Sequence, residues 1–462
     1  MYHPKVVSSE WSDIYDAERI RGNDTVEIGY KQMGGSMGNS FSRRHISRRV
    51  VITGVGVMSP IGQCRDCFWE SLRSGKSGAS RITTFDASSS TVQIAAQVGD
   101  FDWPAQIPTK DQKNVPRTVP LLLRATAEAL ADSRMETAEM TLDERRSIGV
   151  EIGTGGGGFA FTEEHYKYWF IGPKNKASVY IIPASTHGGL SSEVSMAFGF
   201  RGLSHVVSTG CTSSTDAIFY ASEHIRHGRQ DMMIAGGVDA PIAPGILAGF
   251  ELMKVLTTEW NDDPAKASRP FSNDRSGMVL GEGAYVFVLE DIERAVNRGA
   301  KIYAEIAGYG STCDAYHRVR LNDSGEEPAR AMSLSLQDAM ADPDEIDYVN
   351  LHGTSTVLND RIETSAIKQA FGYHAYNIPM SATKSQVGHP QGASGAAGIA
   401  ATLFAMDTGT IPATINLDSP DPDCDLDYVP NVSRQHAINA ALCNCIGFGS
   451  KNSALILRHF AA

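Results

Sequence analysis

Cys211 is the side chain in this sequence best placed for nucleophilic chemistry. It lies in the stretch VVSTGCTSSTDA, in which Val206 and Val207 read as the end of a buried strand and a helix is predicted from Thr212. Unpaired backbone N–H groups and the helix dipole stabilise negative charge at such a turn, so we expect a lowered thiol pKa and a reactive thiolate. A buried, inert cysteine is the commoner alternative, and this stretch alone fits both.

Three further groups stand at predicted strand ends or turns. His352 lies in the glycine turn LHGTST, directly after a predicted buried strand. His389 precedes a small-residue helix in TKSQVGHPQGASG, with Lys384 five residues upstream, and Phe448 lies between glycines in NCIGFGS. A histidine in a turn is often only a local hydrogen-bonding group. Because α/β sites assemble at the ends of strands, we expect these groups to meet Cys211.

The elements that must position these groups form a repeating pattern. Segments of the second part of the chain resemble segments of the first in pattern, though not in residue identity. The corresponding segments are 301–312 and 48–59, 346–354 and 147–155, 388–409 and the turn and helix after Cys211, and 443–458 and the two segments 231–240 and 283–290. The repeat predicts an α/β protein of two pseudo-repeated βα halves, each built around a mostly parallel buried sheet.

The predicted halves span 48–298, with the nucleophile, and 299–462, with the two histidines. Residues 1–47 are polar, with a glycine-rich stretch and a basic cluster, and favour a mobile tail. The glycine run at 154–158 has no Lys-Ser/Thr after it and no helix predicted at its end, so we expect no phosphate loop there.

Composition describes an ordinary globular protein and excludes several functions. The net charge of −12 argues against a general nucleic-acid binder. The longest apolar helix candidate, 396–406, is too short to span a bilayer, and residues 1–10 lack the apolar core of a signal peptide. Seven cysteines, an odd number, suggest free thiols in a reducing cytoplasm. The pair Cys64-x-x-Cys67 has no second CxxC, so we expect packing and no metal site.

The motifs TGCTSS, HGTST-x-x-ND-x-x-E, K-x-x-x-x-GH-x-x-GASGA and GFGS occur here in the order typical of the β-ketoacyl synthases. Over about 48–459 the chain resembles this family of condensing enzymes. The resemblance implies the thiolase fold, layered α-β-α-β-α. TGCTSSTDA and PDPDCDLDYVP (420–430) are more similar to the ketosynthase-alpha subunits of bacterial type II polyketide synthases. Ser450 departs from the glycine that the family usually carries after GFG.

The resemblance implies a decarboxylative Claisen condensation. Cys211 would accept an acyl group from an acyl carrier protein, with the backbone N–H groups of Cys211 and Phe448 as oxyanion hole. His352 and His389 would then stabilise the enolate left when malonyl on a second carrier loses carbon dioxide. Phe448 would also gate the acyl pocket. Neutral imidazole N–H groups suit this task, and the chemistry needs no metal or redox cofactor.

Four further residues receive supporting roles from the resemblance. Lys384 and Glu363 would form a charged support that fixes the surroundings of the second histidine, although a purely structural ion pair is equally consistent. Thr354 and Thr356 would hydrogen-bond the phosphopantetheine arm of the carrier, although turn capping also explains them.

The resemblance also names partners. These are the acyl carrier protein and either a chain-length-factor-like subunit, giving a heterodimer, or a second copy of the chain. Since carriers are acidic and this chain is acidic too, a local basic patch is needed, for which Arg65, Arg73 and Lys76 are candidates.

Three other functions are weighed against this one. A thiolase would explain GHPQGASG and a second cysteine at Cys445, but His352 stands where thiolases carry an asparagine-containing motif. A non-catalytic chain-length factor would lack Cys211. A homodimeric fatty-acid elongation synthase remains the nearest alternative.

Overall fold

The computed structural model describes residues 48–449 and 451–460. The tail predicted over 1–47 and the departure at Ser450 lie outside the described residues. In the described part of the chain, ten strands form one sheet. The first half contributes, in sheet order, β1 (Val50–Met58), β7 (Gly283–Asp291), β6 (Met232–Asp239), β4 (Ile148–Gly153) and β5 (Ser204–Val207). The second half contributes β8 (Ala304–Cys313), β14 (Lys451–Arg458), β13 (Ala440–Gly447), β9 (Tyr348–Asn350) and β10 (Met380–Ser381).

The two halves therefore repeat one strand order, with β1 corresponding to β8 and β5 to β10. A short antiparallel contact between Val51–Ile52 and Ala304–Glu305 joins them. The prediction of mostly parallel sheets is wrong: β4 pairs in parallel with β5 and β6, but β7 is antiparallel to both β6 and β1. The second half repeats this mixture, because β14 follows β13 after only three residues, too few for a crossover helix.

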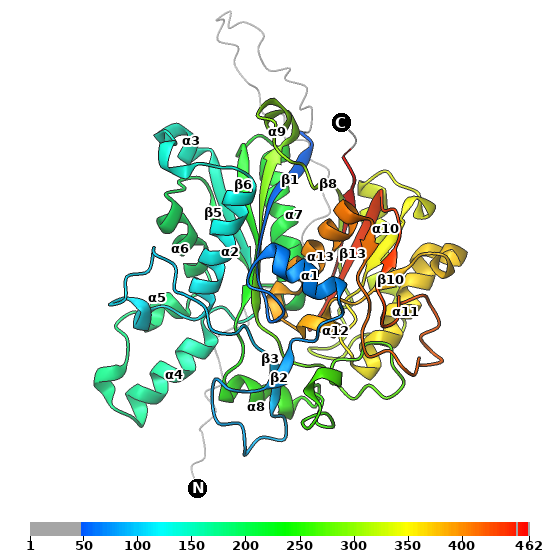
Figure 1. Ribbon diagram of the computed structural model, residues 1–462, viewed down its shortest axis with the longest axis horizontal. Helices are drawn as coiled ribbons and strands as arrows, with labels where there is room; N and C mark the ends of the chain where they lie inside the picture. The colour runs from blue at the N-terminus through cyan, green and yellow to red at the C-terminus, as the bar shows by residue number, and fades with distance from the viewer. Residues whose placement is uncertain (1–47, 450, 461–462) are drawn as a thin grey trace, which may run out of the picture. The chain divides into compact units, whose positions relative to one another are not determined.

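Helices α7 (Ser213–Arg226) and α13 (Ser394–Thr408) pack between the strands of the two halves, as Figure 1 shows. Helix α2 (Thr118–Asp132) covers the outer face of the first half, and α10 (Glu326–Asp338) covers that of the second. The expected α-β-α-β-α layering is confirmed, with the two five-stranded halves of the sheet joined where β1 pairs with β8. A helix that is apolar all round must be buried, and every residue of α13 from Ser394 to Met406 is. A Cβ on Gly395 would collide with Thr215, so this glycine permits the close approach of α13 to α7.

Shorter elements surround this core. The remaining α-helices are α1 (Arg65–Arg73), α3 (Leu142–Arg146), α4 (Phe159–Phe170), α5 (Ile181–Ser185), α6 (Gly189–Phe198), α8 (Pro244–Leu252), α9 (Ile292–Asn297), α11 (Val357–Phe371) and α12 (Lys384–Val387). Two small antiparallel sheets pair β2 (Ala79–Arg81) with β3 (Ile94–Ala96) and β11 (Thr410–Ile411) with β12 (Arg434–Gln435). Helix α4 begins directly after the glycine run at 154–158, where no helix was expected. Within the described ranges, no helix is long and apolar enough to cross a membrane.

Cys64 and Cys67 form a disulfide, so the prediction of free thiols is wrong for this pair. Cys64 is the N-cap of α1, and the backbone N–H of Cys67 donates to its Sγ at 3.1 Å. This capping turn brings the two Cα atoms to 5.2 Å, a normal separation for a disulfide.

Candidate active site

Cys211 lies in a short 3₁₀ turn, Gly210–Thr212, between β5 and the start of α7. Gly210 has a φ of +75°, which allows the chain to turn tightly from strand to helix. Asp216, one turn into α7, accepts hydrogen bonds from Thr212 Oγ1 at 3.0 Å and from the hydroxyl of Tyr309 at 2.7 Å. Since Tyr309 belongs to β8, the aspartate of TGCTSSTDA fixes the nucleophile turn to the second half of the fold.

Burial raises the pKa of the Cys211 thiol to about 11, contrary to the lowered value expected from its position. The reason is desolvation, because the side chain is almost fully enclosed between the two halves. Lys384 and the nearby backbone N–H groups lower the pKa but do not offset this burial. Cys211 is therefore a protonated thiol in the resting site.

Two backbone N–H groups act on the Cys211 sulfur, those of Phe448 and of Cys211 itself. They are the donors expected for an oxyanion hole. Phe448 follows β13, whose last residue, Gly447, passes so close that a Cβ there would lie 3.4 Å from the backbone nitrogen of Cys211. The C-terminal end of β13 thus places the second N–H donor beside Cys211.

His352 and His389 meet Cys211 as expected. One ligand-type atom from each of the three residues lies within 4.8 Å of the others, and all three side chains are buried. The imidazole rings have centroids 5.5 Å apart and planes at 86°. Burial, followed by the charge of Lys384, holds the pKa of both histidines well below the usual value. Both imidazoles are therefore neutral at pH 7.

The partners of each ring fix where its single proton lies. Lys384 Nζ lies 3.2 Å from His352 Nδ1, and an ammonium group can only donate. The backbone N–H of Gln391 donates to His389 Nδ1 at 3.1 Å, and Ser394 Oγ lies 3.2 Å from the same atom. Both Nδ1 atoms are thus acceptors, so Nε2 carries the proton on each ring. The site holds two neutral N–H donors beside one thiol.

Lys384 and Glu363 were expected to fix the surroundings of His389, but both hydrogen-bond to His352 instead, and Lys384 acts on His389 through its charge. Lys384 Nζ donates to the carbonyl of His352 at 2.7 Å. The carboxylate of Glu363 accepts the backbone N–H groups of His352 at 2.7 Å and Gly353 at 2.8 Å. No N···O distance of 4.0 Å or less joins Lys384 to Glu363 among the described residues. Burial raises the pKa of Glu363 to about 6 and lowers that of Lys384.

A cavity of about 530 Å³ opens onto these groups. Its lining includes Cys211, His352, His389, Thr354, Thr356 and Phe448. The hydroxyl groups of Thr354 and Thr356 lie 2.8 Å apart, and both residues border the cavity. All the predicted site residues except Lys384 and Glu363, which lie behind His352, thus reach one cavity.

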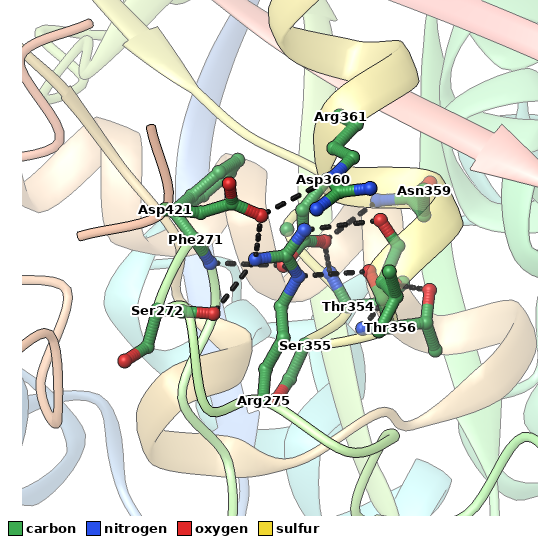
Figure 2. A network of polar contacts seen from close by, with 12 residues as sticks. Phe271, Ser272, Arg275, Thr354, Ser355, Thr356, Asn359, Asp360, Arg361 and Asp421 are labelled. Carbon is green, nitrogen blue, oxygen red and sulfur yellow. Dashed lines mark hydrogen bonds and ion pairs between the residues drawn. The ribbon is translucent and has the colours of Figure 1, made fainter. Parts of the chain in front are cut away.

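A buried ionic network holds the threonine loop in place, as Figure 2 shows. Arg275 Nη1 contacts Asp421 Oδ2 at 2.8 Å, and its Nε lies 3.4 Å from Asp360 Oδ2. Arg275 also donates to the carbonyl of Thr356 at 3.2 Å, while Asp360 accepts the backbone N–H of Thr354 at 3.1 Å. Sequence reasoning assigned no role to Arg275, Asp360 or Asp421. The aspartate inside HGTST-x-x-ND and the one inside PDPDCDLDYVP were the available signals.

Asn444 is a further supporting residue that the motifs did not reveal. Its Nδ2 donates to Glu363 Oε1 at 2.6 Å from the middle of β13. Cys445, the next residue, donates from Sγ to the carbonyl of Cys211 at 3.1 Å. The central strand of the second half therefore contacts both Cys211 and the carboxylate behind His352.

Comparison with known proteins agrees with this geometry. The model of the β-ketoacyl synthase N-terminal domain matches residues 47–295, and that of the C-terminal domain matches residues 303–418. A 3-oxoacyl-[acyl-carrier-protein] synthase 2 of Synechocystis is 40% identical over 413 residues, which are 89% of this chain and 98% of that protein. The tetracenomycin polyketide synthase ketoacyl synthase alpha subunit of Streptomyces glaucescens is 40% identical over 430 residues, covering 90% and 98%.

Solved structures show the same fold. A type II polyketide synthase ketosynthase, in complex with its acyl-carrier protein and bound to a hexaketide, is 31% identical with a TM-score of 0.80. A β-ketoacyl synthase from Burkholderia phymatum is 33% identical with a TM-score of 0.82. Each covers 90% of this chain and is itself covered completely. With a buried cysteine and two neutral histidines in one cavity, the chain belongs to the β-ketoacyl synthase family of acyltransferases.

Proposed function

We propose that the chain is the ketosynthase-alpha subunit of a type II polyketide synthase, extending an acyl chain on Cys211 with malonyl units from an acyl carrier protein. The observation that carries the condensation chemistry is the pair of neutral imidazoles beside the thiol. Charged imidazolium groups would bind the malonyl carboxylate and oppose its loss. Neutral N–H donors favour the enolate that forms when the carboxylate leaves.

The first step is acyl transfer. The sulfur of Cys211 attacks the carbonyl of the carrier thioester, and the carrier thiol leaves with the proton that Cys211 gives up. The backbone N–H groups of Cys211 and Phe448 would hold the oxyanion of the tetrahedral intermediate. Because the resting thiol is protonated, Lys384 assists this step by favouring the thiolate.

The second step is decarboxylation of malonyl on a new carrier. The bond between the α-carbon and the carboxylate breaks, carbon dioxide leaves, and the electron pair stays as an enolate. The Nε2–H groups of His352 and His389 would donate to the enolate oxygen. The α-carbon then attacks the Cys211 thioester, expels the thiolate, and leaves a β-ketoacyl chain two carbons longer on the carrier. Bond cleavage itself supplies the electron pair, so the proposed reaction uses no metal or redox cofactor.

The carrier would place its phosphopantetheine arm in the cavity. Thr354 and Thr356 would hydrogen-bond the arm, and Lys254 and Arg320, which also line the cavity, suit its phosphate. Of the docking candidates from the sequence, Arg65 is already engaged by Asp132 and by the hydroxyl of Tyr303. Among the described residues, Arg73 forms an ion pair only with the exposed Glu70 of its own helix, so it is the better candidate.

The proposal of a polyketide rather than a fatty-acid synthase rests on TGCTSSTDA and PDPDCDLDYVP, and relatives of both kinds are similar to this chain. A partner subunit is supported by large apolar side chains around α4 and α5: Phe170, Ile171, Val179 and Ile182 are 67–86% exposed. Strand β5 also has a neighbour on one side only among the described strands. Exposed apolar patches and free sheet edges are typical of protein interfaces. We therefore propose a heterodimer with a chain-length-factor-like subunit.

The test is to express the full-length chain alone and together with a chain-length-factor-like subunit, and to supply malonyl-carrier. We expect a heterodimer that extends several malonyl units, and little elongation by the chain alone. His352→Ala or His389→Ala should retain loading of Cys211 but lose about 10²–10³ in the rate of carbon dioxide release. Full elongation by a purified homodimer would instead establish the fatty-acid-type synthase.

A further inference from the structure

A second cluster of histidine and carboxylate side chains lies at the edge of the sheet. Glu151 of β4 and His205 of β5 are direct partners in the parallel register. Val150 and Ile152, on either side of Glu151, belong to the apolar cluster that includes residues of α2. Because neighbouring residues of a strand point to opposite faces, Glu151 points to the face that α7 covers.

Helix α7 supplies the third member. His224 Nε2 lies 3.5 Å from Glu151 Oε2, and the rings of His224 and His205 have centroids 6.0 Å apart. One ligand atom from each of the three residues lies within 4.8 Å of the others. Two imidazoles and a carboxylate, from three elements that are separate in the sequence, therefore lie close to one point.

The inner part of this cluster lacks the partners that buried polar groups normally have. Glu151 is 4% exposed, and its Oε2 makes no hydrogen bond within the described part of the chain. Neither does the buried Nδ1 of His224. A buried carboxylate oxygen without a hydrogen-bond partner is costly unless a cation or a proton is present.

We propose that Glu151, His205 and His224 bind a divalent transition-metal ion, with Zn²⁺ as the probe. Two imidazole nitrogens and one carboxylate oxygen form a donor set that Zn²⁺ accepts, and in the single chain, where His205 is exposed, water can complete the coordination. The ion would balance the charge of Glu151 and tie the edge strand β5 to α7. His224 is 11 residues from Ser213, roughly 17 Å along the helix, so the ion has a structural rather than catalytic role.

The expectation of no metal site came from the spacing of cysteines. It could not reveal this cluster, because the three ligands are brought together by strand register and helix packing. The alternative occupant is a proton shared by Glu151 and His224, which needs neither His205 nor a metal. The two explanations differ in what His205 does.

The experiment is a Zn²⁺ titration of the full-length protein in a Cys211→Ala background. This background is needed because Cys211, His352 and His389 form a second cluster with metal-ligand spacing. Binding is followed with a chromophoric chelator as competitor, and the metal content is measured after dialysis. We expect one Zn²⁺ per chain, a higher thermal midpoint, and an X-ray absorption spectrum with nitrogen and oxygen ligands only.

Adding His205→Ala should weaken binding on the order of 100-fold or more, and so should adding His224→Ala. The chain is titrated without the proposed partner subunit; His205 is exposed in the single chain, so its substitution leaves the fold intact even if variants of the buried residues do not fold. His227→Ala is the matched control, since His227 is an exposed histidine on the next turn after His224 and should change nothing. Unchanged affinity in His205→Ala, sulfur in the coordination shell, or no stoichiometric binding would overturn the proposal.

Discussion

The Nζ atom of Lys384 contacts two atoms of His352, the backbone carbonyl oxygen at 2.7 Å and the ring Nδ1 at 3.2 Å. One buried ammonium group therefore fixes the position of the first histidine and the nitrogen that carries its proton. The same charge lowers the pKa of Cys211 against the effect of burial. In the proposed mechanism, Lys384 is thus a positioning residue that links the two chemical steps.

Substitution of Lys384 should change both steps in a way that a purely structural role would not. In Lys384→Met the Cys211 pKa should rise, so the pH profile of thiol alkylation should move to higher pH. Release of carbon dioxide from malonyl-carrier should fall about 10²-fold, because His352 is no longer held as a donor. Lys266→Met, at an exposed lysine, is the control. An unchanged alkylation profile would contradict this role.

Glu363→Gln should destabilise the protein although the two side chains have nearly the same shape. Glu363 accepts a backbone N–H on each of its two oxygens, and a glutamine would present an NH₂ group to one of these donors. A cost of about 1–3 kcal/mol follows, measurable by urea unfolding. Glu326→Gln on exposed surface should stay within about 0.5 kcal/mol of the parent. Equal stability of the two variants would refute the two-donor arrangement.

The residues of the site could be predicted from the sequence because short motifs identify them, and the repeated strand pattern indicates which strand ends lie together. The predictions that were wrong concerned properties that depend on long-range packing. The pKa of Cys211 follows from how completely the two halves enclose it, and the support of His352 by Lys384 follows from where α12 lies. The mixed sheet escaped prediction because buried strands look alike in either direction. Helix α4 escaped because the glycine run before it gave no starting signal.

Cys211 and Cys445 should behave differently although both are buried in the site. The Cys445 thiol donates to the Cys211 carbonyl, and burial raises its pKa even more strongly than that of Cys211. Cys211→Ala should abolish acyl loading from a carrier thioester. Cys445→Ala should reduce the rate of acyl loading by at most about tenfold, because about tenfold corresponds to the free energy of one hydrogen bond. Intact-protein mass spectrometry measures both, and acyl mass on the Cys445 peptide would revive the thiolase alternative.

The buried histidines should make stability fall in mild acid. Because the folded-state pKa of His389 is well below 6.5, the unfolded chain binds a proton there that the folded chain does not. Its contribution to stability is therefore complete above about pH 7 and is lost as the pH falls through 6.5. Below pH 6.5 the slope of unfolding free energy against pH should be smaller in His389→Asn, by about 1.4 kcal/mol per pH unit. Parallel slopes for the two proteins would argue against a neutral buried imidazole.

Arg275 and Arg361 both contact Asp421. Substituting each in turn should show how much a buried and an exposed ion pair contribute to the free energy of unfolding. The Arg275 side chain is 1% exposed and that of Arg361 is 46% exposed. Arg275→Met leaves Asp360 buried without its cation and Asp421 with Arg361 alone, which should cost about 3–5 kcal/mol. Arg361→Met should cost less than about 1 kcal/mol, since water screens that pair.

The network in Figure 2 also predicts a functional difference between these two variants. Arg275 donates to the carbonyl groups of Thr356 and Val357, so its loss should loosen the loop that would hold the phosphopantetheine arm. At a temperature where both variants are folded, Arg275→Met should raise KM for the carrier several-fold, and Arg361→Met should leave it unchanged. Steady-state kinetics with malonyl-carrier provides the measurement. If both variants kept the parental KM, the network would stabilise the fold without positioning the threonine loop.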